Sequence, residues 1–160
     1  MRTQRILLLE DNGGFAESMI ANLFPHKIDL VDNLSSFNSL LYKDPGVKGY
    51  DLVLMDLFFH VSPSAWEKLC IRIPEMRREK PCKVKGIPLY GLDYFVGKVL
   101  TNPETKDIAE TKFVLFSGHA RLIRTEKLFE EHGIQFPIER LLDKADGLFD
   151  NLSKFINMPD

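Results

Sequence analysis

The chain has 160 residues, which is the size of one compact domain and leaves little room for a second folded unit. Its composition, 44% apolar and 28% charged, is that of a packed globular protein and excludes a disordered chain. The formal net charge of -2 argues against a protein that works mainly by binding nucleic acid or an anionic membrane.

The sequence carries no targeting or redox signal. The apolar run 6–9 is cut short by two acids, so it falls below the roughly 7 to 15 residues of a signal-peptide core. No run approaches the roughly 20 apolar residues of a membrane span. Cys70 and Cys82 lack metal-ligand spacing. We therefore expect a cytoplasmic protein with reduced thiols and neither a nucleic-acid nor a membrane partner.

Short apolar runs alternate with stretches of helical period, which is typical of βαβ units around a parallel sheet. Strands are expected, in chain order, at residues 5–9, 28–31, 50–57, 112–116 and 139–142. The run 50–57 is almost wholly apolar, as a central strand buried on both faces requires.

Helices are expected after the strands, where apolar residues recur every three or four positions. The first helix should place Ile20 on its buried stripe, and the second should begin at an N-cap, Asp32 or Asn33. After the fourth strand, one helix is expected to continue to His132.

Residues 60–90 form a segment too long for an ordinary strand-to-helix loop. The helical spacing of its apolar residues from Trp66 to Ile73 predicts one short helix that Pro74 ends. Seven basic and three acidic residues give the segment a net charge of +4. The charge of the chain is therefore segregated.

Polar side chains follow the carboxyl ends of four of the expected strands. They are Glu10 and Asp11, Asp56, Ser117 and Lys144. In an open parallel sheet, ligands bind outside these ends, where the strand order reverses. Three carboxylates placed together raise at least one pKa unless cations offset them, and Mg²⁺ and the lysine would do so.

These residues resemble the receiver domain of two-component response regulators. The match lies in residues 5–12, 50–56, 113–120 and 142–144, and residues 91–108 look like the family's third helix and the loop after it. The resemblance implies a single receiver domain over 1–160, with a flavodoxin-like, doubly wound α/β fold of five strands in the order 2-1-3-4-5. Segment 60–90 would be a basic insertion between strand 3 and helix 3.

The resemblance also implies roles for individual residues. Asp56 would be the phosphoacceptor, with Lys144 and Ser117 contacting the phosphoryl group. Mg²⁺ would be held by Glu10, Asp11, Asp56 and the backbone carbonyl of Phe58.

On this reading the chain is a stand-alone, phosphorylation-activated switch. A histidine kinase or phosphotransfer protein would supply the phosphoryl group. A downstream protein or a homodimer would carry the output, since the chain leaves no room for an output domain. We expect no enzyme activity beyond phosphorylation and dephosphorylation at Asp56.

Departures from the family leave a second reading open. Leu141 stands where an aromatic residue usually turns inward on phosphorylation, and Ala145 stands where a proline usually follows the lysine. These favour a phosphorylation-independent pseudo-receiver that acts as a protein-interaction module. The basic segment would either cover the acidic rim and limit access to it, or form a partner surface with Trp66 as an apolar anchor.

Two enzyme classes fit less well. A phosphatase of the haloacid dehalogenase type needs a second acid at the position of Phe58. A nucleotide-binding enzyme needs a phosphate loop, and residues 11–14 match neither the dinucleotide fingerprint nor a P-loop.

Overall fold

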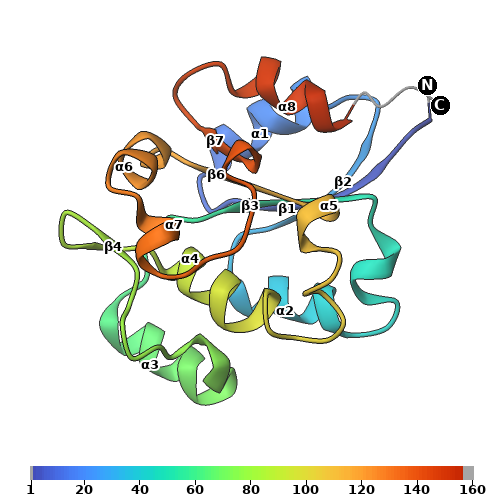
Figure 1. Cartoon of the computed structure of the whole chain (residues 1–160). Coiled ribbons are helices and arrows are strands. Elements are labelled where there is room, and N and C mark those ends of the chain that lie inside the picture. Colours follow the sequence, from blue (N-terminus) through green and yellow to red (C-terminus); the bar gives the residue numbers. More distant parts are fainter. Residues whose placement is uncertain (1, 157–160) are drawn as a thin grey trace.

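Five parallel strands form the central sheet of the structure, a computed structural model that describes residues 2–156 (Figure 1). In chain order they are β1 (Arg5–Leu9), β2 (Lys27–Val31), β3 (Leu52–Asp56), β6 (Phe113–Ser117) and β7 (Leu141–Asp143). Their order across the sheet is β2-β1-β3-β6-β7, which confirms the predicted order 2-1-3-4-5. The order reverses between β1 and β3, so the carboxyl ends of these two strands flank the switch point.

Helices cover both faces of the sheet (Figure 1). Helices α1 (Gly13–Asn22) and α8 (Leu148–Ile156) pack on one face, whereas α2 (Leu34–Tyr42), α4 (Tyr90–Tyr94) and the π-helical η3 (Phe95–Val99) pack on the other. Side chains along a strand alternate between the two faces, so Ile6 and Leu8 join the first layer while Leu7 and Leu9 join the second. The resulting α/β/α sandwich has the flavodoxin-like architecture that the sequence predicts.

Shorter elements complete the chain. They are η1 (Gly46–Gly49), α3 (Pro63–Arg72), η2 (Pro74–Met76), β4 (Lys83–Val84), β5 (Ile87–Pro88), α5 (Ala109–Lys112), α6 (Ala120–Thr125), α7 (Leu128–Glu131) and η4 (Ile138–Arg140). None of the helices described is long and apolar enough to cross a membrane.

Asparagine side chains start both of the first two helices. The Asn12 side chain accepts a hydrogen bond from the backbone N–H of Phe15 at 3.0 Å and so caps α1. Asn33, one of the two predicted caps, accepts from Ser36 N–H at 2.8 Å and begins α2. The predicted burial of Ile20 is wrong, because α1 meets the sheet through other apolar residues and leaves Ile20 39% exposed.

The helix predicted to run from the fourth strand to His132 is two short helices, α6 and α7. Lys127 lies between them with φ +53°, a left-handed conformation that breaks the helical hydrogen-bond ladder. The last two strands also begin later than predicted, at Phe113 and Leu141. The fifth is shortened because residues 138–140 form a 3₁₀ turn instead.

Segment 60–90 folds onto the outer side of α4 and η3. It contains the predicted short helix, which is α3 and ends before Pro74, and a small antiparallel hairpin, β4–β5. Its Met76, Cys82 and Val84 are fully buried in the same apolar cluster as the sheet face. Gly97 in η3 accommodates it, since a Cβ there would collide with the carbonyl oxygen of Glu75.

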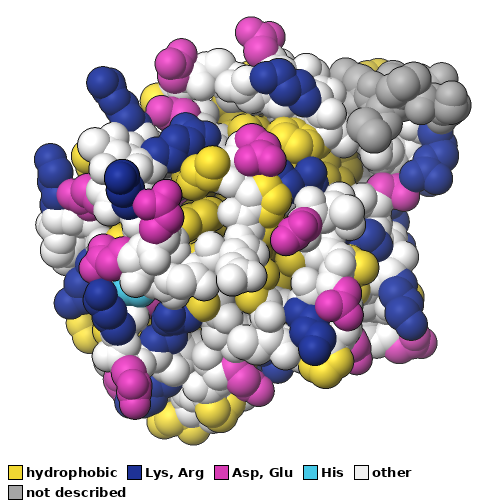
Figure 2. Space-filling view, viewed as in Figure 1, with side chains coloured by type: hydrophobic (Ala, Val, Ile, Leu, Met, Phe, Trp, Pro, Cys, Tyr) yellow, Lys and Arg dark blue, Asp and Glu magenta, His cyan; other side chains and the backbone are white. Residues whose placement is uncertain are grey.

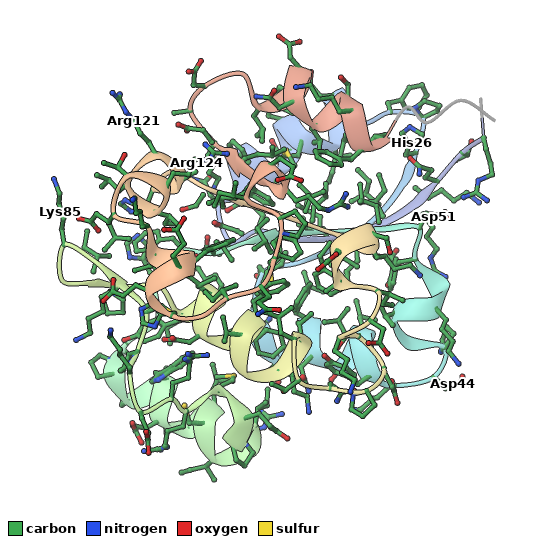
Figure 3. All side chains as sticks on the ribbon, in the orientation of Figure 1. His26, Asp44, Asp51, Lys85, Arg121 and Arg124 are labelled. Carbon is green, nitrogen blue, oxygen red and sulfur yellow. The ribbon has the colours of Figure 1, made fainter. Side chains whose placement is uncertain are left out.

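Charged side chains of both signs are interspersed over the face seen in Figure 2. Basic side chains are frequent along its left edge, where Figure 3 places Lys85 at the tip of the hairpin and Arg121 and Arg124 on α6. The carboxyl ends of the strands point toward this edge (Figure 1).

Candidate functional site

Three carboxylates meet at the switch point between β1 and β3. Glu10 and Asp11 directly follow β1, and Asp56 ends β3, whose Met55 is in register with Leu9. One oxygen from each carboxylate lies within 4.8 Å of the other two. Glu10 and Asp56 are each 1% exposed, whereas Asp11 is open to solvent. The strand positions thus bring together the three acids that the sequence predicts to do so.

Lys144 reaches this cluster from the end of β7. Its Nζ lies 2.6 Å from Glu10 Oε2 and donates a hydrogen bond to Asp56 Oδ2 at 3.2 Å. The same ammonium group lies 4.4 Å from the centre of the Phe15 ring on α1, a cation–π contact. The backbone N–H of Lys144 donates to the carbonyl oxygen of Ser117 at 3.1 Å, which holds the ends of β7 and β6 together. Lys144 is therefore the cation that offsets the two buried carboxylates.

Backbone amides hold each carboxylate in place. Phe58 N–H donates to Asp56 Oδ1 at 3.1 Å, Asn12 N–H donates to Glu10 Oε1 at 2.9 Å, and His60 N–H donates to Asp11 Oδ2 at 3.3 Å. The loops after β1 and β3 are therefore both tied to the site.

The environment of Asp56 disfavours its charged form. Burial, opposed by the Lys144 ammonium and reinforced by the neighbouring Glu10 carboxylate, raises the pKa of Asp56 to about 7. Burial alone would lower the pKa of Lys144, but the attraction of Asp56 and Glu10 outweighs it and leaves that pKa raised. The lysine is thus held charged beside an acid that is easily protonated near neutrality.

Ser117 ends β6, which pairs with β3, and is fully buried. Its Oγ accepts a hydrogen bond from His119 N–H at 2.9 Å, so the hydroxyl is already linked to the loop that leads into α6. The structure places this predicted site residue at the same sheet edge as Asp56 and Lys144.

An aromatic cluster beside the site was missed by the sequence reasoning. The Phe58 ring packs edge-on against His60 at 5.3 Å and against His119 at 4.9 Å between ring centres. It bridges the loops after β3 and β6. The available signal was that all three residues lie two to four positions after strands whose carboxyl ends share one edge.

The residues present fit Mg²⁺. The cluster offers carboxylate oxygens of Glu10, Asp11 and Asp56 within 4.8 Å of one another, and oxygen ligands are those that this cation prefers. Asp11 is open to solvent, so the cluster can be reached from outside. The backbone N–H of Phe58 donates to Asp56 Oδ1. That the backbone carbonyl of Phe58 binds the metal ion stays a prediction.

Two residues, Leu141 and Ala145, differ from the usual receiver pattern, and the structure shows what surrounds each. Leu141 is fully buried, and its carbonyl oxygen accepts a hydrogen bond from the Arg124 guanidinium on α6. Ala145 N–H donates to Asp143 Oδ1 at 2.8 Å, which turns the chain directly after Lys144.

The basic side chains of segment 60–90 find their partners away from the acidic site. Within residues 2–156, those that form ion pairs do so with Glu67, Asp93 and Glu131. Trp66 stacks on Tyr90, with ring centres 4.2 Å apart, and so joins α3 to the end of the segment, where α4 begins. Within the described chain, the prediction that this charge covers the acidic rim has no ion pair to support it.

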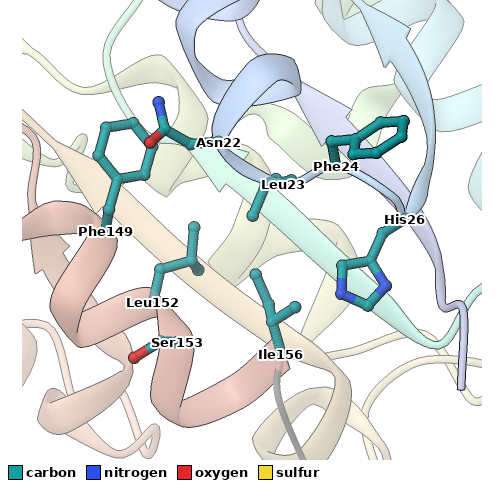
Figure 4. Close-up of a pocket in the computed structure, with 8 residues that line it drawn as sticks. All are labelled: Asn22, Leu23, Phe24, His26, Phe149, Leu152, Ser153 and Ile156. Carbon is teal, nitrogen blue, oxygen red and sulfur yellow. The ribbon is translucent and has the colours of Figure 1, made fainter. Parts of the chain in front are cut away.

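A separate cavity of about 260 Å³ lies at the opposite end of α1 from the acidic cluster (Figure 4). Its lining comes from the end of α1, the turn after it and α8, and consists of Asn22, Leu23, Phe24, His26, Phe149, Leu152, Ser153 and Ile156. The His26 Nδ1 atom accepts from Gln4 N–H at 3.0 Å. This histidine therefore has a structural role at the amino edge of the sheet.

No protein-family model and no curated protein matches the chain. Among solved structures, the chain is similar to that of a bacteriophytochrome response regulator, AtBRR, with 17% sequence identity and a TM-score of 0.57. The superposition covers 98% of this chain and 92% of that one. At this identity the likeness establishes the fold, so the predicted receiver-type fold is confirmed. It does not assign a role to any site residue, and those roles must be argued from the geometry and charge of the site.

Proposed function

We propose that the chain is a response regulator receiver that accepts a phosphoryl group on Asp56. The observation that carries this proposal is the buried Asp56 carboxylate, paired with Lys144 Nζ at 3.2 Å and placed beside Glu10 and Asp11 at the switch point. A structural ion pair has no need of two buried carboxylates on one lysine with a third carboxylate beside them, because surplus negative charge is costly to bury. A site that receives a cation and a phosphoryl group has that need.

The proposed reaction is a transfer between two nucleophiles. An Asp56 carboxylate oxygen attacks the phosphorus of a phosphohistidine, the P–N bond breaks, and its electron pair leaves with the imidazole of the donor. Bound Mg²⁺ would supply charge neutralisation at the phosphoryl oxygens. Lys144 already lies against Asp56 and would pair with a phosphoryl oxygen in the product.

Ser117 would convert the chemistry into a conformational signal. Its hydroxyl now accepts from His119 N–H and would instead donate to a phosphoryl oxygen. That rotation would move the loop between β6 and α6. Helix α6 carries Arg124, which donates a hydrogen bond to the Leu141 carbonyl, so the movement would reach β7. The proposed output is a shift in the population of this loop and helix, read by a downstream protein or a second copy of the chain.

The partners follow from the chemistry. The proposed donor is a histidine kinase or a phosphotransfer protein, because an aspartyl acyl phosphate forms readily from a phosphohistidine. The proposed reactions are phosphorylation and dephosphorylation of the chain's own Asp56, with no other substrate.

A direct test is incubation of the protein with Mg²⁺ and acetyl phosphate, followed by intact mass spectrometry. The wild type should gain one phosphoryl group that is labile to alkali, and Asp56→Asn should gain none. Asp107→Asn, which changes an exposed acid on the loop before α5, is the matched control and should react like the wild type. Steady phosphate release from varied monoesters would point instead to a phosphatase.

The pseudo-receiver is the second candidate, and one observation favours it. Leu141 is aliphatic and fully buried, so the inward rotation of an aromatic ring is unavailable as the coupling step. If the wild type stays unmodified while an ordinary receiver reacts under the same conditions, the protein-interaction module is the better account.

A further inference from the structure

A second cavity, of about 320 Å³, lies between segment 60–90 and helix α4, and we name it the Trp66 cavity. Its lining consists of Trp66, Glu67, Met76, Arg77, Arg78, Pro81, Lys83, Pro88, Tyr90 and Asp93. All of these except Asp93 belong to segment 60–90, and none belongs to the acidic site. A ligand here would therefore be one that the proposed phosphorylation chemistry does not use.

One wall of the Trp66 cavity is flat and apolar. The Trp66 and Tyr90 rings stack with centres 4.2 Å apart and an interplanar angle of 27°. Both side chains are half-buried, and two prolines flank them in the lining. Flat aromatic surface of this kind packs best against another planar group.

The lining also carries positive charge, from Arg77, Arg78 and Lys83. Arg78 is the central group, because its Nε atom is buried and has no hydrogen-bond partner among the described residues. Its contact with Asp93 Oδ1, at 3.9 Å, is too long for a hydrogen bond, and that oxygen already accepts from Cys82 N–H at 2.8 Å. The guanidinium as a whole is only partly buried, with 21% of the side chain exposed, so it can still donate to an acceptor that a ligand brings.

Two more cations stand at the cavity rim. Lys83 is exposed on β4 and has no ion-pair partner within residues 2–156. Arg77 pairs with Glu67 at 2.6 Å, but both side chains are more than half exposed, so this pair is weak and can be exchanged. The cavity therefore offers charge to a ligand at little cost in existing contacts.

We propose that the Trp66 cavity binds a planar aromatic anion. The ring would pack against the Trp66–Tyr90 wall, and the phosphate or carboxylate would accept from Arg78 and Lys83. A nucleoside monophosphate and an aromatic carboxylic acid share this chemistry, and the volume lies at the lower end of the range usual for small-molecule sites.

Such a ligand would lie close to the acceptor strand. Tyr90 directly precedes Gly91, whose N–H donates to the carbonyl oxygen of Leu57 at 3.1 Å. A Cβ on Gly91 would lie 2.8 Å from the carbonyl oxygen of Asp56, so the start of α4 rests on the strand end itself. The site is distinct from the acidic cluster yet adjacent to the backbone that carries it.

Trp66 is the only tryptophan of the chain, so its fluorescence reports on this cavity alone. We would titrate the full chain, without Mg²⁺ or phosphodonor, with AMP and separately with 4-hydroxybenzoate, exciting at the red edge of indole absorption. The expected result is saturable quenching by at least one of them. Quenching by AMP would indicate a phosphate ligand, and quenching by 4-hydroxybenzoate would indicate a carboxylate ligand. Adenosine and inorganic phosphate, each lacking one half of the chemistry, should bind at least about tenfold more weakly.

Variants distinguish binding in the cavity from a nonspecific attraction of anions to basic side chains. Arg78→Gln and Lys83→Gln should each weaken binding about tenfold, as the loss of a charge-assisted hydrogen bond does. Arg72→Gln on α3 and Lys85→Gln at the hairpin tip remove the same charge outside the lining and should leave binding unchanged. Circular dichroism checks that each variant is folded, and the exposed Lys83 keeps the test available if Arg78→Gln is not.

Several results would overturn the proposal. One is the lack of saturable quenching by either aromatic anion up to millimolar concentration. Others are equal binding of adenosine and AMP, or equal weakening by the lining and the control variants. Binding of a polyglutamate peptide in place of both small anions would assign the surface to an acidic protein partner. Because phosphorylation of Asp56 is measured separately, failure here leaves the proposed function standing.

Discussion

Replacing Asp56 by asparagine keeps the size of the side chain and removes a carboxylate that burial disfavours. The pKa of Asp56 is raised from 3.8 to about 7, so the folded state binds a proton more tightly than the unfolded state. The stability that this proton confers is complete below about pH 4 and is lost as the pH rises through 7. The shift of about three units corresponds to a ceiling of about 4 kcal/mol at pH 8.

The asparagine variant has no such titration, so its advantage should grow with pH. Because it also gives up the ion pair with Lys144, we expect it to be more stable than the wild type by about 2 kcal/mol at pH 8. The advantage should shrink toward pH 5. Urea unfolding in buffer with EDTA, at intervals between pH 5 and 8, measures the free energies of unfolding.

Asp107→Asn is again the control, and its pH dependence should run parallel to that of the wild type because Asp107 is exposed. An Asp56→Asn variant that is less stable than the wild type at pH 8 would refute the reasoning. So would a stability difference that is independent of pH, since either result means that the folded protein holds Asp56 as a stable anion.

Four further outcomes are expected. Gly91→Ala should cost about 2 kcal/mol in urea unfolding, because its Cβ would overlap the strand backbone at 2.8 Å, whereas Gly13→Ala, with nothing within 4 Å, should cost nothing. Asn33→Ala should cost about 1 kcal/mol through loss of the cap of α2, and glycine at this position only a few tenths. Lys144→Met should destabilise by about 2 kcal/mol at pH 8 and less at pH 5, which lies below the pKa of about 7 of Asp56, so that this carboxylate is protonated. Mg²⁺ should raise the melting temperature of the wild type at pH 8, with the effect reduced in Asp11→Asn and removed by EDTA.

The sheet and its acidic site were predictable because both follow from position along strands. Residues that come directly after parallel strands share one edge, so Glu10, Asp56 and Lys144 had to meet if the strand order was right. Apolar runs and polar strand ends carry that information in the sequence itself. The same rule would have found the Phe58 and His119 contact, had aromatic residues after strands been weighed with the acids.

Features that depend on tertiary packing could not be predicted from the sequence. The break at Lys127 places a lysine in a left-handed conformation, and residue type gives no warning of it. The sequence showed a surplus of positive charge in segment 60–90, but the pairing of Lys80 with Glu131 on α7, at 2.9 Å, depends on how the segment docks. Net charge therefore predicted the basic character of the segment but not which acids its side chains pair with.

The way segment 60–90 joins the domain bears on how such a piece could be gained or removed. Its ends are neighbours, since Gly91 N–H bonds to the Leu57 carbonyl, so a short turn could bridge them and save about 2 kcal/mol of loop-closure entropy. The interior of the segment, however, is packed into the domain. Met76 is fully buried, and Gly97 has no side chain, which leaves room for the Glu75 carbonyl. Excision would expose apolar surface and an unfilled groove on η3. The topology permits a clean deletion, but the packing demands compensating substitutions, beginning with a side chain at position 97.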